Sequence, residues 1–334
     1  MSAPAPEAVV DAFGLPGPVV SMTAVAGAWS NRLYCLETAR GAFAVKEMCN
    51  PWRDPRWQEW LAEAWSFELR ARAAGIPAPE PIPSRIDGGC LAWVDAPGGD
   101  PVPVRVHRWV DGVPASDGPV DDTVADRAGG ILATLHGLGV EPTDRAVFPV
   151  STTETADRWP ELCGAARRAG VAWADALDAA SAAVSEAAGL AREAGRRPTA
   201  EVMTHGDVDQ KNLILTTAGP VLCDWDVAMP LAPRRELADV ALSLGGWDRL
   251  DVSRRVVRAY AAAGGGDTEI EPSDLGESLM RGLDWIAFNV ECAIGRRPAS
   301  PDRAARAERL TPVLLAEFPG RTALALRIGG TLAP

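Results

Sequence analysis

Hydrophobic and polar residues alternate along the first part of the chain, as they do in the strands of a half-buried sheet. The runs VVSMTAVA, LYCLET and AFAVKEM follow one another between residues 17 and 48, and short turns separate them. Residues 56–74 carry a helical pattern that ends at Gly75, and a proline-rich connector follows. The runs LAWVDA and PVPVRVHRWV then predict two further strands. The pattern therefore predicts an antiparallel sheet with one helix.

The pattern changes after Asp111 and Gly112, where helical periodicity takes over. The segments expected to be mainly helical are 121–138, 155–195, 234–262 and 274–295, and the second of these fits two helices. Between them, residues 200–228 hold three short strand-like runs, EVMTH, NLILTT and PVLCDWD. We expect an α+β fold with two lobes: a smaller one at 1–107, and a larger, mainly helical one at 108–334.

Composition narrows the class of protein. The 334 residues are 47% hydrophobic and 23% charged, which excludes a disordered chain, a collagen-like chain and a disulfide miniprotein. The formal charge of −12 argues against nucleic acid as the main partner. No stretch is long and apolar enough for a membrane span or a signal peptide, and the six cysteines have no zinc-like spacing. We expect a soluble cytoplasmic protein with reduced thiols; the sequence does not specify an oligomeric state.

The choice of basic residues is unusual. Of the 33 basic residues only Lys46 and Lys211 are lysine, and all the others are arginine. Arginine is a planar fork, whereas lysine is a compact point charge on a slim stem. Drift in composition is the simplest explanation, but both lysines lie inside the motifs that follow.

One constellation suggests chemistry. His205-Gly206-Asp207 is followed by Asn212 and an apolar run, and a second apolar run ends at Asp224-Trp225-Asp226. Two apolar runs joined by a turn form a hairpin, so Asn212 at its start and Asp224 at its end can converge on one point. An amide and a carboxylate oxygen suit Mg²⁺, which also binds nucleotide phosphates. Asp207, in the loop beside them, can accept a proton from a hydroxyl group.

This constellation resembles the aminoglycoside phosphotransferase and choline kinase family, which has a protein-kinase-like fold. That family has His-Gly-Asp with an Asn five residues after the Asp, and then Asp-Trp followed by an acid. The likeness extends to Gly27-Ala28-Trp29-Ser30-Asn31-Arg32 and to AFAVKEM, VHRWVDG, LATLHGL and PRRELADVALSL. It covers residues 20–295, and the ordered combination of motifs is far more specific than His-Gly-Asp alone.

The resemblance implies a role for each matching residue. Asp207 would be the catalytic base, and Asn212 and Asp224 would hold Mg²⁺. Lys46 would bind the α- and β-phosphates of ATP or GTP and pair with an acid on the following helix. Glu63 is the expected acid and Glu59 the alternative, because both lie on one helical face.

The resemblance implies roles at further matching positions. The main chains of Arg108 and Val110 would contact adenine, and the Ser30-Asn31 turn would cover the phosphates. That turn lacks the Gly-x-Gly-x-x-Gly pattern of protein kinases. Asp226 would either ligate the metal or line the site. Lys211 would either touch the transferred phosphoryl group or be a solvated loop charge.

The acceptor implied by the resemblance is a hydroxyl group of a small molecule. Asp284, Phe288 and Glu291 can share one face of a helix, so the two acids are candidate acceptor-binding residues, although acids on a helix are commonly just a solvated face. We expect an ATP-dependent O-phosphotransferase that acts on an antibiotic, aminoglycoside-like or nucleoside-like, and confers resistance. The alternatives are a metabolic kinase for a choline-like molecule, an amino alcohol or a sugar, and a nucleotide-binding pseudokinase.

Overall fold

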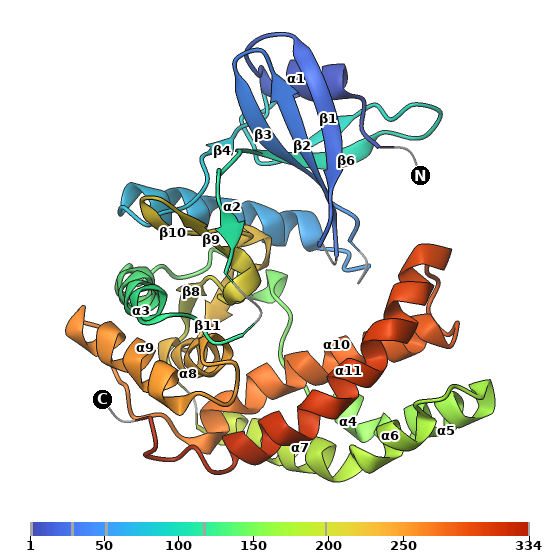
Figure 1. Cartoon of the computed structure of the whole chain (residues 1–334), viewed down its shortest axis with the longest axis vertical. Helices are drawn as coiled ribbons and strands as arrows, with labels where there is room; N and C mark the ends of the chain where they lie inside the picture. Colours follow the sequence, from blue (N-terminus) through green and yellow to red (C-terminus); the bar gives the residue numbers. More distant parts are fainter. Residues whose placement is uncertain (1–2, 28–29, 51–52, 116–117, 198, 333–334) are drawn as a thin grey trace. The chain divides into compact units, whose positions relative to one another are not determined.

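The structure is a computed structural model that describes residues 3–27, 30–50, 53–115, 118–197 and 199–332. It has the expected α+β fold, with an antiparallel sheet near the N-terminus and mainly helices near the C-terminus (Figure 1). Contacts divide the chain into two compact units. The first comprises Met1–Asp117, Thr134–Phe148 and Met203–Pro230, and the second comprises Gly118–Ala133, Pro149–Val202 and Leu231–Pro334.

This division differs from the expected boundary after residue 107. The motifs at 203–230 group with the N-terminal residues, because this segment bonds directly to them. The backbone N–H of Leu222 donates to Pro77 O at 2.8 Å, and the indole Nε1–H of Trp60 donates to Ala228 O at 2.8 Å. The first unit therefore contains both Lys46 of the sheet and the His205-Gly206-Asp207 loop.

An antiparallel sheet organises the first unit. Its strands lie in the order β1 (Val19–Val25), β2 (Arg32–Thr38), β3 (Gly41–Glu47), β6 (Val102–Arg108) and β4 (Pro81–Ile82), and β5 (Ala92–Val94) also pairs with β6. The runs predicted from alternation thus correspond to β1, β2, β3, β5 and β6. The connector holds the short strand β4, which was not predicted.

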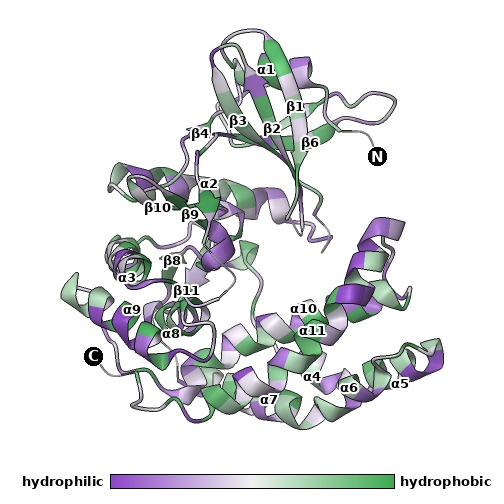
Figure 2. Ribbon diagram, in the orientation of Figure 1, coloured by the Kyte–Doolittle hydropathy of each residue, from purple (hydrophilic) through white to green (hydrophobic). Residues whose placement is uncertain are grey.

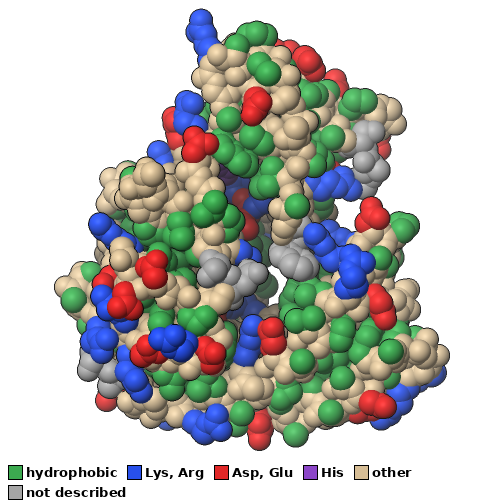
Figure 3. Space-filling model, in the orientation of Figure 1, with side chains coloured by type: hydrophobic (Ala, Val, Ile, Leu, Met, Phe, Trp, Pro, Cys, Tyr) green, Lys and Arg blue, Asp and Glu red, His purple; other side chains and the backbone are tan. Residues whose placement is uncertain are grey.

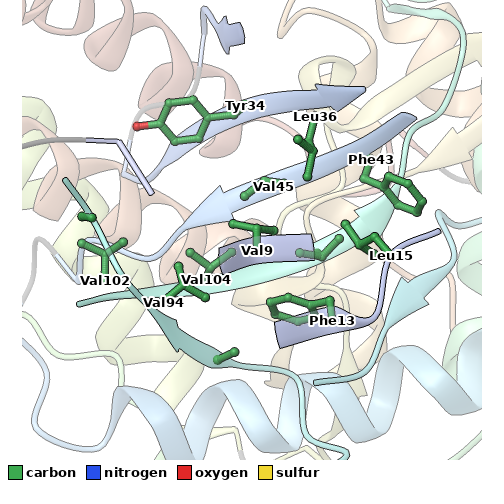
Figure 4. Packing of buried hydrophobic residues seen from close by; sticks show 13 residues of the cluster. Val9, Phe13, Leu15, Tyr34, Leu36, Phe43, Val45, Val94, Val102 and Val104 are labelled. Carbon is green, nitrogen blue, oxygen red and sulfur yellow. The ribbon is translucent and has the colours of Figure 1, made fainter. Parts of the chain in front are cut away.

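One face of this sheet is covered by a helix that the sequence pattern missed. Helix α1 (Pro6–Phe13) inserts Val9 and Phe13 among side chains of β2, β3, β5 and β6. Figure 4 shows Leu36, Val45 and Val104 gathered beneath it. The helix has only two turns, too few for its periodicity to stand out. This apolar layer fixes which face of each strand is buried, and so directs the intervening side chains to the opposite face.

Helix α2 (Trp57–Ala73) is close to the predicted helix at 56–74. It buries Leu61, Ala64, Phe67, Glu68 and Ala71. A smaller sheet contains β10 (Gly219–Leu222), β9 (Leu213–Thr216) and β7 (Val113–Pro114), in that order. Strands β8 (Val202–Thr204) and β11 (Met229–Leu231) pair separately. The hairpin β9–β10 is the one that the motif spacing predicts.

The second unit is mainly helical. Its helices, with the 3₁₀ turn η4, are α3 (Asp122–Gly137, which runs on into the first unit), α4 (Glu154–Asp157), α5 (Trp159–Ala169), α6 (Ala174–Ala179), α7 (Ser181–Arg196), α8 (Pro233–Leu244), α9 (Leu250–Ala262), η4 (Pro272–Leu275), α10 (Gly276–Ala293) and α11 (Pro301–Ala325). Helices α10 and α11 pack side by side, and α7 packs against both. Figure 2 shows green and purple residues mixed along α5, α7 and α9, as in amphipathic helices.

Two features of this unit differ from the prediction. Residues 155–195 form four helical segments instead of two, partly because Gly170 adopts a left-handed conformation and ends α5. The 25-residue helix α11 was not predicted, and it contains Pro312 and Pro319, which ordinarily interrupt a helix.

The surface and the helices bear on the class of protein. On the face drawn in Figure 3, acidic and basic side chains are interspersed, without a large area of one sign. No helix within the described part of the chain is long and apolar enough to span a membrane.

The packing of α3 against α9 gives a first prediction. A Cβ on Gly129 would meet Val256 O at 2.5 Å and the Cβ of Ala259 at 2.7 Å, whereas a Cβ on the adjacent Gly130 would meet no atom within 4 Å. We expect G129A to lower the free energy of unfolding by about 1–3 kcal/mol through overpacking. The control G130A should raise it by about 0.5–1 kcal/mol, because alanine favours a helix. Chemical denaturation followed by circular dichroism measures both, and equal effects of the two substitutions would contradict this packing.

Candidate active site

The sheet register places two cations opposite each other. Lys46 on β3 pairs with Arg105 on β6 in the antiparallel ladder. Their neighbours Val45, Val104 and Val106 are buried in the apolar layer under α1, so Lys46 and Arg105 point to the other face of the sheet. Like charges directly opposite each other in a sheet are destabilising. An anion is therefore needed between them.

Asp226 is that anion. Its Oδ1 accepts a hydrogen bond from Arg105 Nη1, and its Oδ2 forms an ion pair with Lys46 Nζ. Lys46 also donates to Asp224 Oδ1. Burial alone would lower the pKa of Lys46, but the two aspartates raise it above its ordinary value. Burial likewise opposes ionisation of Asp226, yet Lys46 and Arg105 hold its pKa well below the usual range. Lys46 and Asp226 are therefore both charged at neutral pH.

Helix α2 supplies the outer end of this cluster. Glu68 Oε2 accepts from Arg105 Nη2 at 2.8 Å, and Glu68 Oε1 lies 3.0 Å from His107 Nε2 on the same face of β6. The side chains of Glu68 and Arg105 are both 0% exposed. Trp65, one turn earlier on α2, lies with its ring 5.6 Å from the Arg105 guanidinium carbon. Burial opposes ionisation of Glu68, but His107 and Arg105 lower its pKa.

The loop before β9 is built on His205 and Gly206. His205 Nε2 lies 2.9 Å from Cys223 O, so this nitrogen donates, and Nδ1 accepts from the backbone N–H of Asp207 at 3.4 Å. The ring also meets Trp225 edge-on. Gly206 has a φ of 81°, and a Cβ there would lie 2.8 Å from Val227 O. His205 thus holds the loop in place, and only glycine fits the turn.

Asp207 forms a compact polar group with residues further along the loop. Its Oδ2 accepts from Asn212 Nδ2 at 2.9 Å and lies 3.0 Å from Lys211 Nζ. Lys211 also pairs with Asp209, whose Oδ1 accepts from the backbone N–H of Asn212. Burial opposes ionisation of Asp207, but Lys211 lowers its pKa. Burial and the neighbouring Asp207 raise the pKa of Asp209 to about 6. The Asp207 carboxylate is therefore ionised, and its side chain remains 39% exposed.

Asn212 and Asp224 lie at the same end of the hairpin. Asn212 immediately precedes β9, and its carbonyl accepts from Cys223 N–H at 2.8 Å, so Asp224 follows directly after that bond. Asp224 has a left-handed backbone (φ 68°, ψ 52°), which turns its side chain out of the strand path. The Asn212 amide nitrogen donates to the backbone and the side chain of Asp207. The amide oxygen lies on the other side of that group and therefore points away from Asp207.

The oxygen donors around Asn212 and Asp224 have a chemistry that suits a particular metal ion. No three His, Cys, Asp or Glu side chains among the described residues form a metal-binding group. A pair of oxygen ligands that leaves most positions to water and phosphate is instead the arrangement that Mg²⁺ favours. The amide oxygen of Asn212 and the second carboxylate oxygen of Asp224 have this chemistry, so the residues fit a magnesium ion shared with a nucleotide.

The acid expected to pair with Lys46 makes other contacts. Glu63 Oε2 accepts from the backbone N–H of Thr143 at 3.2 Å, and Glu59 pairs with Arg56. The expected Lys46–Glu63 pair is therefore absent from the described residues. Lys46 is held by the two aspartates, and the acid of α2 that reaches the cluster is Glu68.

The residues expected to contact the nucleotide occupy the first unit too. Asn31 Oδ1 accepts from Cys49 N–H at 3.0 Å, which ties the turn before β2 to the end of β3. Ala28 and Trp29 of that turn lie outside the described residues. The backbone N–H of Arg108 donates to Glu80 O at 2.8 Å. No hydrogen bond from the Val110 N–H is found among the residues described.

The two acids expected to bind the acceptor lie on α10, in the second unit. Asp284 Oδ1 accepts from Thr155 at 2.5 Å, and burial raises the pKa of Asp284. Glu291 is paired with Arg297 at 2.9 Å and lies 3.7 Å from Arg158. Glu291 is therefore already neutralised by arginine, whereas Asp284 has no ion pair among the described residues.

Sequence reasoning missed Arg105 and Glu68. A signal for Arg105 was present, since it is a charged residue flanked by the apolar residues Val104 and Val106 in the middle of a predicted strand. The sequence signal for Glu68 was weaker. A charged residue next to an apolar one in a helix, as Glu68 is next to Phe67, usually lies on the solvent-exposed face, whereas the structure buries both. The side chain of His107 also contacts Glu68.

Comparisons with known proteins also indicate a phosphotransferase. A profile described as the phosphotransferase enzyme family matches residues 21–272. No curated protein matches the sequence. A solved structure of spectinomycin phosphotransferase in complex with ADP and spectinomycin superposes with a TM-score of 0.70, at 12% identity over 95% of this chain and 97% of that one.

Two further solved structures are similar. A microcompartment-associated aminopropanol kinase has a TM-score of 0.61 at 18% identity, over 97% of this chain and 96% of that one. Choline kinase LicA from Streptococcus pneumoniae has a TM-score of 0.56 at 14% identity, over 90% and 94%. At these identities the likeness establishes a common fold. Together with the matched profile, it means that the chain belongs to the phosphotransferase enzyme family and is a phosphotransferase with an alcohol group as acceptor.

Proposed function

We propose that the protein transfers the γ-phosphoryl group of ATP to a hydroxyl group of a small, amine-bearing molecule, most simply an antibiotic. The observation that carries the proposal is the convergence, within one compact unit, of Lys46 and Asp224 with the loop that holds Asp207 and Asn212. These are the side chains that phosphoryl transfer needs for positioning and for charge neutralisation.

Lys46 is the proposed ligand of the α- and β-phosphates. Without nucleotide it is satisfied by Asp224 and Asp226, so phosphate oxygens can replace the Asp224 contact while Asp226 keeps the ammonium in place. Arg108 and Val110 are proposed to meet adenine through their main chains, and Ser30 and Asn31 to cover the phosphates. GTP would fit the same phosphate contacts.

Asn212 and Asp224 are the proposed ligands of Mg²⁺. When bound, the ion would supply positive charge that neutralises the charge developing during transfer. Both oxygens of Asp226 are engaged by cations, which supports a role in holding Lys46 over a role as a metal ligand.

Asp207 is the proposed base. The acceptor hydroxyl would donate a hydrogen bond to this carboxylate, its oxygen would attack the γ-phosphorus as the bond to ADP breaks, and its proton would pass to Asp207. The pKa of Asp207 lies below its usual value, so the carboxylate orients the hydroxyl and takes the proton only as transfer proceeds. Lys211, 3.0 Å from Asp207, is the cation proposed to touch the transferred group.

The acceptor class rests on charge. The names of the similar structures include an aminoglycoside phosphotransferase, an aminopropanol kinase and an ethanolamine kinase, whose named substrates carry amine and hydroxyl groups. This chain is acidic, with a formal charge of −12. Of the two candidate acids, Asp284 is proposed to receive the amine, because the charge of Glu291 is already compensated by Arg297.

A metabolic kinase acting on an amino alcohol is the second candidate. It is favoured by the aminopropanol kinase, which has a higher identity to this chain than spectinomycin phosphotransferase, 18% against 12%. A pseudokinase is disfavoured, because Lys46, Asp207, Asn212 and Asp224 are all present and mutually arranged.

The role of Asp207 is tested by D207N. The amide cannot take the hydroxyl proton, so we expect kcat to fall by roughly 10²–10⁴-fold, with little change in ATP affinity. D251N is a matched control, since Asp251 is an exposed aspartate paired with Arg249. Turnover can be followed as acceptor-dependent release of ADP, and a D207N enzyme with wild-type turnover would remove Asp207 from the mechanism.

The acceptor class is tested by a screen for products. The enzyme, Mg²⁺ and labelled ATP are incubated with aminoglycosides, spectinomycin, nucleoside antibiotics, choline, amino alcohols and neutral sugars. We expect label on an amine-bearing alcohol. With that acceptor, D284N should raise the acceptor KM by roughly tenfold or more and leave the KM for ATP unchanged, while E291Q has a smaller effect on the acceptor KM. Label only on a neutral sugar would contradict the acceptor class, though not phosphotransfer.

A further inference from the structure

The buried cluster beside the nucleotide lysine has alternating charges. In spatial order it runs Glu68, Arg105, Asp226, Lys46, Asp224, and each member is paired with the next. Its first three side chains are at most 6% exposed. Two elements, β3 and β6, contribute one cation each, and the register fixes those cations opposite each other. The acids come from α2 and from the segment after β10.

Arg105 is shaped for this position. Its guanidinium uses Nη2 for Glu68 and Nη1 for Asp226, so one planar group joins a helix to the segment that carries Asp224. Lysine, a point charge, cannot hold two acids in such a fixed relation. The Arg105 Nε is buried and has no hydrogen-bond partner among the described residues. The group is therefore oriented by its two acids, and one donor is left unsatisfied as a consequence.

Stability alone does not account for such a cluster. Buried ion pairs commonly contribute little net stability, because desolvation offsets their attraction. Apolar residues already fill the other face of the same strands, so the sheet tolerates apolar side chains at these registers. The cluster instead fixes the position of a charge, Lys46, in a site that must present it to phosphate.

We propose that Arg105 is a positioning residue through which the helix acid Glu68 orients Lys46, with Asp226 as the link between the two cations. Helix α2 and the nucleotide lysine are thus coupled by a relay and not by a direct lysine–glutamate pair. Asp226 keeps its contact with Arg105 whether or not nucleotide is bound, and so Lys46 stays aligned after it leaves Asp224. The inference rests on the proposed role of Lys46 in nucleotide binding.

The test is a thermodynamic cycle on nucleotide affinity, which needs no acceptor. Binding of a non-hydrolysable ATP analogue with Mg²⁺ is measured by calorimetry for the wild type, E68Q, R105M, E68Q/R105M, E63Q and K46M. We expect E68Q and R105M each to weaken binding by roughly tenfold or more. Because Glu68 acts through Arg105, the double variant should bind no more weakly than R105M. E63Q should weaken binding less than E68Q does.

Folding is controlled separately. R235M removes another buried arginine, which pairs with Glu277 in the second unit, so it should lower the melting temperature without changing nucleotide affinity. R105M leaves two buried acids without their cation; if it does not fold, the comparison of E68Q with E63Q decides the question alone. A larger effect of E63Q, wild-type affinity of E68Q, or losses that multiply in the double variant would overturn the relay.

The K46M variant distinguishes a failure of the proposed function of Lys46 from a failure of the relay. If K46M binds nucleotide as the wild type does, the proposed function of Lys46 fails. If K46M loses binding while E68Q does not, only the relay fails.

Discussion

The carboxylate of Asp226 lies between two cations that the sheet register forces to face each other. Without this anion, Lys46 and Arg105 would repel each other across a buried ladder. With it, the repulsion becomes a linked set of ion pairs that extends from Glu68 on α2 to Asp224 after the hairpin. The aromatic contact of Phe67 with Trp225, and the bond from Trp60 to Ala228 O, attach α2 to the same segment. The position of the nucleotide lysine is thus set by helix, sheet and hairpin together.

The loop that carries the proposed base, Asp207, is held in place by hydrogen bonds and a glycine turn instead of buried ion pairs. His205 bonds Cys223 O on one side and Asp207 N–H on the other, while Gly206 supplies the left-handed turn between them. Asn212 then donates a hydrogen bond to the Asp207 side chain. The bond from Cys223 N–H to Asn212 O places the next residue, Asp224, at the same end of the hairpin as Asn212. Backbone bonds of the hairpin therefore bring the proposed base and the proposed metal ligands together before any ligand arrives. Such preorganisation is what phosphoryl transfer requires of a protein.

The fold was largely predictable, because period-two alternation identified β1, β2, β3, β5 and β6 and the spacing of the motif identified the hairpin β9–β10. Short or proline-containing elements such as α1 and α11 were not predictable by periodicity. The polar constellation was found from spacing, since Asn212 and Asp224 are close in sequence and joined by one hairpin. The link from α2 to Lys46 through Arg105 and Asp226 was not found, because it depends on the register of β3 with β6 and on which face of α2 is buried. Neither the strand register nor the buried face of the helix can be predicted from a local sequence pattern.

A crystal structure of the protein with Mg²⁺ and a non-hydrolysable ATP analogue tests the central claim most directly. The account predicts that Lys46 Nζ moves from Asp224 to phosphate oxygens while it keeps Asp226, that Arg105 still joins Asp226 to Glu68, and that Asn212 and Asp224 share the metal ion. A Lys46 paired with Glu63, or an Asp226 released from Arg105 on nucleotide binding, would contradict it.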